Sequence, residues 1–228
     1  MVNERSTYEG IYVAPEAARI IRATSVDLEK PVNVNNRHIL RWIRNGLALP
    51  ALREVPGRDL VISFTDLISM RVIALMRAAG YTWKQIYTSE DWVRHATGAD
   101  RPFATKRFWL ALREIYTEHE GRLLAASLGG QYPFVDLIED HLVPVAGLTF
   151  DKEGLADSWT VHPSDPRTMR PNVQFGAPCI RGTRIPTQTV WEMNEGGDSA
   201  AFIARVYDLE VRQVEEAIEW EKRLQAAA

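Results

Sequence analysis

The sequence has little cysteine, no long apolar run and almost no excess charge, and each shortage excludes a class of protein. A single cysteine, Cys179, stands among the 228 residues, so the chain can form no internal disulfide. That composition fits a reducing cytoplasm. No apolar run approaches the length of a membrane span, and residues 1–6 lead into polar sequence without the apolar core of a signal peptide. We therefore expect a cytoplasmic protein that does not enter a membrane.

The sequence also lacks the residue patterns that metal binding and catalysis need. Its five histidines are scattered without the spacing of metal ligands. Cys179 has no second thiol nearby and is better explained as a small buried hydrophobe than as a zinc ligand or a nucleophile. Asp136, Glu139 and Asp140 form an acidic group, but no further carboxylates are placed to complete a nuclease centre. We expect no catalytic site, no metal and no cofactor, and hence a protein that is not an enzyme.

Charge is nearly balanced over the whole chain, at −3, but its two signs are separated along the sequence. Residues 37–59 contain only Glu54 and Asp59 as acids, beside a basic group that consists of Arg37, His38, Arg41, Arg44, Arg53 and Arg58. Residues 192–223 carry nine carboxylates against four basic side chains. A basic stretch suits phosphate whereas an acidic surface repels it, so the two ends of the chain are expected to bind different partners.

Capping residues, glycines and apolar spacing predict a mainly α protein with minor β structure. A first helix begins within residues 12–21. A second helix is capped by Asn33 or Asn35, runs to Asn45 and ends at Gly46.

Residues 49–62 contain turn residues followed by a short apolar strand at 60–62, a pattern typical of a hairpin. A capping box at 63–66 then starts a helix that Gly80 ends, and another helix follows from Thr82.

The middle of the chain is less regular. Residues 108–124 have helical spacing, and residues 134–138 and 142–150 resemble strands, so we expect a connector with its own β structure. Three short helices close the sequence, at residues 188–194, 199–206 and 211–224. Short helices at such spacing form a three-helix, helix-turn-helix-like unit.

The most informative segment is residues 176–187, with the sequence GAPCIRGTRIPT. Gly176 and Gly182 permit backbone angles that are closed to residues with a Cβ, and the two prolines fix φ. We expect Cys179 and Ile180 to be buried and the two arginines to be exposed. An ordinary rigid turn ahead of a helix would explain part of this pattern.

The segment resembles the signature of a small antitoxin family, often called VapB-type, whose members are encoded beside PIN-like ribonuclease toxins. In that family the pattern reads G-x-P-C/V-I-x-G-T-R-I-P. The resemblance implies that the C-terminal part binds and inhibits such a toxin. It also implies the toxin contacts, which are Arg181, Thr183 and Arg184.

The first third of the chain resembles the DNA-binding domain of MerR-type winged-helix regulators. The likeness rests on an ordered set of segments, residues 12–19, 34–47, 62–67, 71–73 and 79–86. Their order is that of the family: a helix, a recognition helix that ends in Gly-Leu, a wing, and two helices joined at a Gly-aromatic turn. This sequence departs from the family at Leu40, where a contacting arginine is usual, and at residues 23–32, which make a longer connection than a MerR turn.

A helix fits the major groove of DNA and reads base edges with residues near its N-terminus. Polar and basic side chains occupy the faces that the apolar Ile39 and Ile43 leave free, although a solvated basic helix face is the plainer explanation. On the DNA-binding interpretation, the contacts on the recognition helix and the wing are Asn35, Asn36, Arg37, His38, Arg41, Arg44, Arg53 and Arg58.

These expectations divide the chain into a MerR-like winged helix-turn-helix domain at 1–98, a β-containing connector at 99–156 and a toxin-binding domain at 157–228. The resemblances imply an antitoxin of a type II toxin–antitoxin pair that binds a PIN-like ribonuclease and its own operator DNA. The alternative is a stand-alone MerR-like transcription regulator that senses a small ligand. Trp42, Trp83, Trp92 and Trp109 could then form an aromatic cage, although tryptophans at helical spacing are more often core residues.

We predict that the protein is a homodimer, because one winged helix reads few base pairs and palindromic half-sites demand two-fold symmetry. By elimination, the middle region is expected to supply the contact. Light scattering at micromolar concentration measures the mass, and a monomer both with and without DNA would contradict the prediction.

Overall fold

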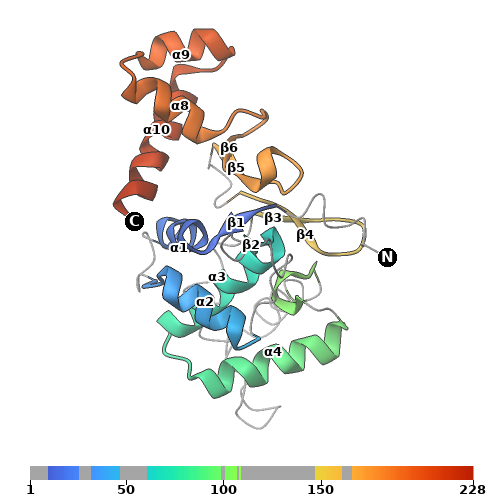
Figure 1. Cartoon of the computed structure of the whole chain (residues 1–228). Coiled ribbons are helices and arrows are strands. Elements are labelled where there is room, and N and C mark those ends of the chain that lie inside the picture. The colour runs from blue at the N-terminus through green and yellow to red at the C-terminus, as the bar shows by residue number, and fades with distance from the viewer. Residues whose placement is uncertain are drawn as a thin grey trace, which may run out of the picture.

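The computed structural model describes residues 10–25, 32–46, 61–98, 101–106, 108, 147–160 and 166–227. Helices dominate the described residues, and the strands there form three antiparallel sheets of two strands each. The prediction of a mainly α protein with minor β structure is therefore confirmed. Figure 1 shows the N-terminal helices at one end of the molecule and the three C-terminal helices at the other, with short strands between them.

Local sequence signals set the helix ends in the N-terminal part. Its elements in chain order are β1 (Tyr12–Val13), α1 (Ala14–Ala23), α2 (Asn36–Arg44), β2 (Val61–Ile62), α3 (Phe64–Ala78) and α4 (Trp83–Thr97). Asn35, Ser63 and Thr82 are N-caps, and each side chain accepts a hydrogen bond from the backbone N–H three residues on. Gly46 and Gly80 follow α2 and α3 with φ values of 75° and 94°, so the predicted ends of these helices are confirmed.

β2 pairs with the strand ahead of the first helix. Tyr12 lies opposite Ile62 and Val13 opposite Val61, in antiparallel register. The strand expected at 60–62 is thus confirmed, but its described partner is β1. Residues 47–60, which contain the rest of the predicted hairpin, lie outside the described part of the chain.

The middle of the chain is described only in part. Its elements are a short 3-10 helix, η2 (Pro102–Ala104), and the hairpin of β3 (Leu148–Phe150) and β4 (Ala156–Trp159). β3 confirms the end of the strand expected at 142–150. The predicted helix at 108–124, apart from Phe108, and the predicted strand at 134–138 lie outside the described residues. β4 crosses the predicted boundary between 156 and 157, and its Trp159 is buried in the N-terminal core.

The C-terminal part begins with a short sheet and ends in three helices. Its elements are β5 (Arg167–Thr168), η5 (Gln174–Gly176), β6 (Cys179–Ile180), α8 (Thr187–Glu195), α9 (Ala200–Tyr207) and α10 (Val211–Ala226). The three helices expected from the sequence are confirmed. They pack around a second, smaller core that includes Ile180, Val190 and Ile218.

Hydrogen bonds join the N-terminal and C-terminal parts of the chain near β1. The Tyr12 hydroxyl donates a hydrogen bond to the Gly176 carbonyl at 2.7 Å, and the Ile11 N–H donates to the Phe175 carbonyl at 2.8 Å. Gly176 has a φ of 91°, and a Cβ added there would lie 2.1 Å from the Tyr12 hydroxyl oxygen. Glycine is therefore required at this point for both its backbone angle and its size.

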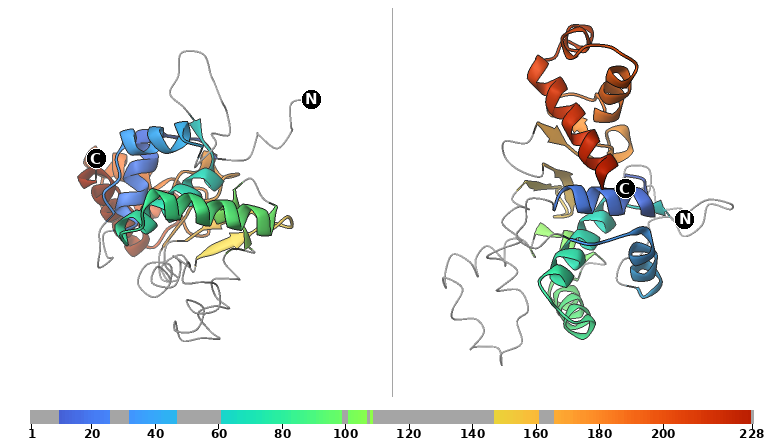
Figure 2. Two further views of the ribbon diagram at one scale, coloured as in Figure 1. Left: turned by 90° about the horizontal axis from the view of Figure 1, so that it is seen from below. Right: turned by 90° about the vertical axis from the view of Figure 1, so that its left-hand side faces the viewer.

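The last helix makes a second connection between the C-terminal and N-terminal parts. α10 runs from the C-terminal core to α1 (Figure 2). There the Arg22 side chain donates to the carbonyl oxygens of Ala227 and of Val34, which lies just ahead of α2. Leu224 adds an apolar contact with the N-terminal core. The first helix therefore contacts both the end of the chain and the segment that leads into α2.

A buried arginine stands at the centre of the N-terminal core. Arg71 of α3 is 1% exposed, and its Nε and Nη2 donate to the hydroxyl and carbonyl oxygens of Thr24 at 3.3 and 3.1 Å. Its guanidinium lies over the Trp159 ring of β4, 5.0 Å from the ring centroid. Burial lowers the pKa of Arg71 to about 10, so the side chain stays charged at neutral pH. Because Thr24 is the C-cap of α1, the charge lies at the negative end of that helix.

We expect Arg71→Ala to lower the free energy of unfolding by about 3 kcal/mol, because it removes the hydrogen bonds to Thr24 and the contact with Trp159 and leaves a cavity. Urea unfolding followed by circular dichroism measures the change. Arg77→Ala is the matched control, since Arg77 lies on the same helix but is exposed, and its loss should cost about 1 kcal/mol or less. Equal losses for the two variants would contradict a central role for Arg71.

Candidate nucleic-acid and protein interfaces

α2 has one buried face and one basic face. Ile39, Trp42 and Ile43 are buried, as the apolar spacing predicted for the two isoleucines. The exposed arginines of α2, which we call the arginine row, are Arg37, Arg41 and Arg44. Residues three and four apart share one helix face, so the three guanidinium groups project on the same side. Within the described residues, no hydrogen bond or ion pair engages these side chains.

The beginning of α2 uses two of the predicted DNA contacts for its own structure. The Asn35 side-chain oxygen accepts a hydrogen bond from the His38 N–H at 3.0 Å, and the Asn35 N–H donates to His38 Nδ1 at 3.4 Å. The His38 ring also stacks on Trp42, with ring centroids 6.4 Å apart. Asn36, the first residue of the helix, is exposed. Asn36, like Arg37 after it, is thus not tied to the cap.

The structure places the remaining N-terminal candidates in different settings. Leu40, which departs from the MerR pattern, packs partly buried against the core. Arg53 and Arg58, expected on the wing, lie outside the described residues, as does the acidic group at 136–140. No cluster of three or more His, Cys, Asp or Glu side chains that could hold a metal ion occurs among the residues that are described. In the same part of the chain, no helix has the length and apolarity to cross a membrane.

The tryptophans of the N-terminal part pack on one another. Trp42 is 2% exposed, and its ring meets that of Trp83 edge to face, with centroids 6.1 Å apart. Trp83 in turn lies 6.5 Å from the Tyr87 ring. The interpretation of Trp42 as a core residue is therefore confirmed, and α4 supports the buried face of α2 through these rings. Trp109 lies outside the described residues.

The Gly/Pro segment forms a tight loop that includes β6 and leads into the first residue of α8. We call this segment, residues 178–187, the arginine loop. Cys179 and Ile180 are 2% and 1% exposed, as the sequence predicted. The Ile180 N–H donates to the Ile185 carbonyl at 3.0 Å and closes the loop. Gly182 makes the turn with a φ of 80°, a conformation that favours glycine.

Side chains fasten this loop as well. The Thr183 hydroxyl donates to the Ile180 carbonyl at 2.8 Å and accepts from the backbone N–H two residues on at 3.0 Å. From outside the loop, Arg170 donates to the Thr183 carbonyl at 3.0 Å and Gln174 donates to the Arg184 carbonyl at 3.1 Å. Thr183, expected as a toxin contact, thus has its hydroxyl engaged within the loop.

The arginine loop presents two exposed side chains, Arg181 and Arg184. Their neighbours in the sequence carry the same charge, since residues 166–191 contain four arginines and no aspartate or glutamate. Arg184 lies just ahead of the N-terminus of α8, where the helix dipole disfavours a cation. Stability of the helix therefore does not explain the charge at this position.

The loop is also anchored to the last helix. Thr187, its final residue, has its hydroxyl 2.5 Å from Glu221 Oε1 on α10. Glu221 is 5% exposed, and burial raises the pKa of its carboxyl group. Glu221 belongs to the acidic run of the C-terminal helices and was expected on their surface, but the structure places it inside, where it joins α10 to the start of α8.

α9 carries an exposed apolar patch that the sequence did not predict. Phe202 and Val206 are 40% and 52% exposed, and Val211 at the start of α10 is 42% exposed. Four-residue spacing places Phe202 and Val206 on one face of the helix. Exposed Asp208 and Glu210 follow directly in the chain, and the exposed Arg205 lies over the Phe202 ring, 5.5 Å from its centroid. We call this apolar surface with its acidic border the α9 patch.

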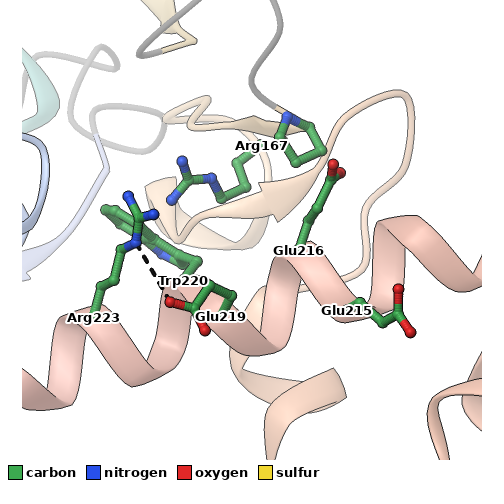
Figure 3. A pocket seen from close by; sticks show the side chains of 7 residues that line it. Arg167, Glu215, Glu216, Glu219, Trp220 and Arg223 are labelled. Carbon is green, nitrogen blue, oxygen red and sulfur yellow. Dashed lines mark ion pairs between the residues drawn. The ribbon is translucent and has the colours of Figure 1, made fainter. Parts of the chain in front are cut away.

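An open groove of about 440 Å³ lies between β5 and α10 (Figure 3). Its lining consists of Pro166, Arg167, Glu215, Glu216, Glu219, Trp220 and Arg223. The Arg167 guanidinium lies over the Trp220 ring, 4.0 Å from the centroid, and Arg223 pairs with Glu219 at 3.7 Å. Since Arg167 covers the aromatic surface and most of the lining is charged, the groove does not have the character of a small-molecule pocket.

Comparisons with known proteins bear on the C-terminal part and on the fold. Residues 168–220 match the family described as protein of unknown function (DUF433). The X-ray crystal structure of Rv2018 from Mycobacterium tuberculosis matches with a TM-score of 0.67, covering 91% of this chain and 96% of that one at 16% sequence identity. At this identity the likeness shows the fold alone. A search of curated proteins finds no match.

Proposed function

We propose that this chain is the antitoxin of a type II toxin–antitoxin pair, which neutralises a PIN-like ribonuclease and also binds its own promoter DNA. The observation that carries the proposal is the arginine loop, a fastened turn that holds Arg181 and Arg184 exposed ahead of α8. The resemblance of residues 176–187 to the VapB-type signature supports the nature of the partner. The family matched at 168–220 covers the loop, although its description states no function.

The arginine loop suits the active site of such a nuclease. By the same resemblance, that site is a cluster of carboxylates that binds a divalent cation. A guanidinium has the opposite charge and can bind a carboxylate through two hydrogen bonds. Because backbone and side-chain hydrogen bonds already fix the loop, little backbone entropy is lost when its arginines bind. Arg181 and Arg184 therefore serve as a plug or a rim contact for the carboxylates.

The α9 patch supplies a second contact of different character. Protein interfaces combine an apolar centre with a polar rim, which is the arrangement of Phe202 and Val206 beside Asp208 and Glu210. A ribonuclease needs basic surface to bind RNA. The acidic border of the patch complements such a surface, while the arginine loop complements the carboxylates.

The arginine row supports the promoter-binding half of the proposal. An α-helix fits the major groove, where arginine binds guanine edges through two hydrogen bonds. Burial of Ile39, Trp42 and Ile43 holds α2 against the core, so the row keeps a fixed direction. The acidic C-terminal helices repel phosphate, which leaves the N-terminal part as the surface for DNA.

The alternative function is a stand-alone MerR-like regulator that senses a small ligand. Small-molecule sites are concave and offer apolar surface to the ligand, whereas the groove at Trp220 is open and five of its seven lining residues are charged. A change in DNA affinity when a ligand is added, with no partner protein present, would favour this alternative.

Replacing both loop arginines, as Arg181→Ala with Arg184→Ala, should weaken binding of the ribonuclease by at least about tenfold, because a charged contact with its carboxylates is lost. Isothermal titration calorimetry measures the affinity, and rescue of growth during toxin expression measures neutralisation. Promoter binding by the free antitoxin should be unchanged.

The matched control is Arg77→Ala with Lys84→Ala, which removes two exposed positive charges from α3 and α4. This control should bind the ribonuclease as the parent chain does. If toxin affinity is unchanged in the loop variant while circular dichroism shows an intact fold, the arginines have only a structural role.

Arg37→Ala and Arg41→Ala should each cost about 1–3 kcal/mol of promoter binding if the side chain makes a bidentate base contact. Electrophoretic mobility shift at matched salt measures the loss. Arg212→Ala, an exposed arginine on α10, should bind DNA like the parent. Parent-like binding by both α2 variants would show that α2 is not the recognition helix.

A further inference from the structure

Two neighbouring residues ahead of the arginine loop have a backbone conformation that side chains disfavour. Gln174 and Phe175 have φ values of 49° and 54°, and neither is a glycine. The left-handed region crowds the Cβ of an L-residue, and for a bulky side chain it is a genuine outlier. Strain of this kind persists where the surroundings impose it, and it gathers at functional sites.

The neighbouring contacts explain the backbone angle at residue 175, but they do not explain why that residue is a phenylalanine. The turn delivers the Phe175 carbonyl to the Ile11 N–H and brings Gly176 to the Tyr12 hydroxyl. Glycine would adopt the same angle without strain. The Phe175 ring is 67% exposed, so it adds little to the core in return. The identity of this residue is therefore not required by the fold.

Phe175 does not stand alone on the surface. Ile11, whose N–H binds the Phe175 carbonyl, is 47% exposed. The segment that holds the ring is also fixed to the arginine loop, because Gln174 donates to the Arg184 carbonyl at 3.1 Å. An exposed apolar pair and an exposed arginine segment are thus linked by direct hydrogen bonds.

We propose that Phe175, with Ile11 beside it, is an anchor that inserts into an apolar pocket at the rim of the ribonuclease active site. This inference rests on the proposed function, and it adds an apolar contact to the charged one made by the arginine loop. Aromatic residues held in one conformation are typical anchors at the centre of protein interfaces. The charge next to this segment points to the same partner, because the residue to which Gln174 is bonded, Arg184, has an exposed guanidinium that complements an acidic site.

The test uses Phe175→Gly in the full chain. In this variant the stability of the fold should be kept or increased, whereas the affinity for the ribonuclease should fall. Glycine relieves the backbone strain, so the melting temperature should stay the same or rise. Loss of the ring should weaken binding of the PIN-like ribonuclease encoded by the adjacent gene at least tenfold, measured by isothermal titration calorimetry. A merely structural role for Phe175 cannot give this combination.

Phe175→Asn is the second variant, because asparagine tolerates the left-handed region and keeps a side chain. It should bind the ribonuclease as weakly as Phe175→Gly does. Tyr87→Ala is the control for loss of an exposed aromatic ring, since Tyr87 lies on α4 and is 38% exposed. This control should bind like the parent chain.

Parent-like ribonuclease affinity in both Phe175 variants would overturn the inference and leave the proposed function standing. Weaker promoter binding with unchanged ribonuclease affinity would also overturn it, because the ring would then contact nucleic acid. A change from dimer to monomer with unchanged ribonuclease affinity would overturn it in favour of a contact between two copies of the chain. If the parent chain itself does not bind the ribonuclease, the proposed function fails and this inference fails with it.

Discussion

The architecture depends on a positive charge that the fold keeps away from water. No carboxylate pairs with Arg71 among the described residues, and the C-terminal end of α1 and the Trp159 ring supply the negative partial charge instead. These groups come from separate segments, so the charge is stabilised only when α1, α3 and β4 are all in place. Both α2 and α10 contact α1, and the proposed DNA-binding helix and the C-terminal unit therefore share one support.

Features set by neighbouring residues could be predicted from the sequence, whereas features set by distant contacts could not. Three helices are capped by Asn35, Ser63 and Thr82. Each side chain accepts a hydrogen bond from the backbone N–H three residues later, so the cap depends only on neighbouring sequence. The pairing of β1 with β2 joins segments separated by two helices, and no periodicity encodes it. Among the candidate interfaces, helical spacing predicted the exposure of Arg37 and Arg41. The strained angle of Phe175 could not be predicted, since its cause is the backbone of Ile11 at the other end of the chain.

Two side chains, Glu221 and Phe202, show how composition alone misleads. Glu221 belongs to an acidic run, yet it lies buried against Thr187, because one face of a long helix must meet the core. The exposed Phe202 belongs to a helix in which every residue except Arg205 is apolar or aromatic. A helix of this length needs only one buried face, so a surplus of apolar residues was the available signal for an interface.

The bond from Arg22 to the Ala227 carbonyl restricts the length of α10. A helix has about 3.6 residues per turn, so inserting or deleting one residue would rotate its last turn by about 100°. Leu224 would leave the N-terminal core and the Ala227 carbonyl would turn away from Arg22. The contacts with the first helix thus constrain the length of the last helix. Related chains that keep this joint should differ in this helix by whole turns rather than by single residues.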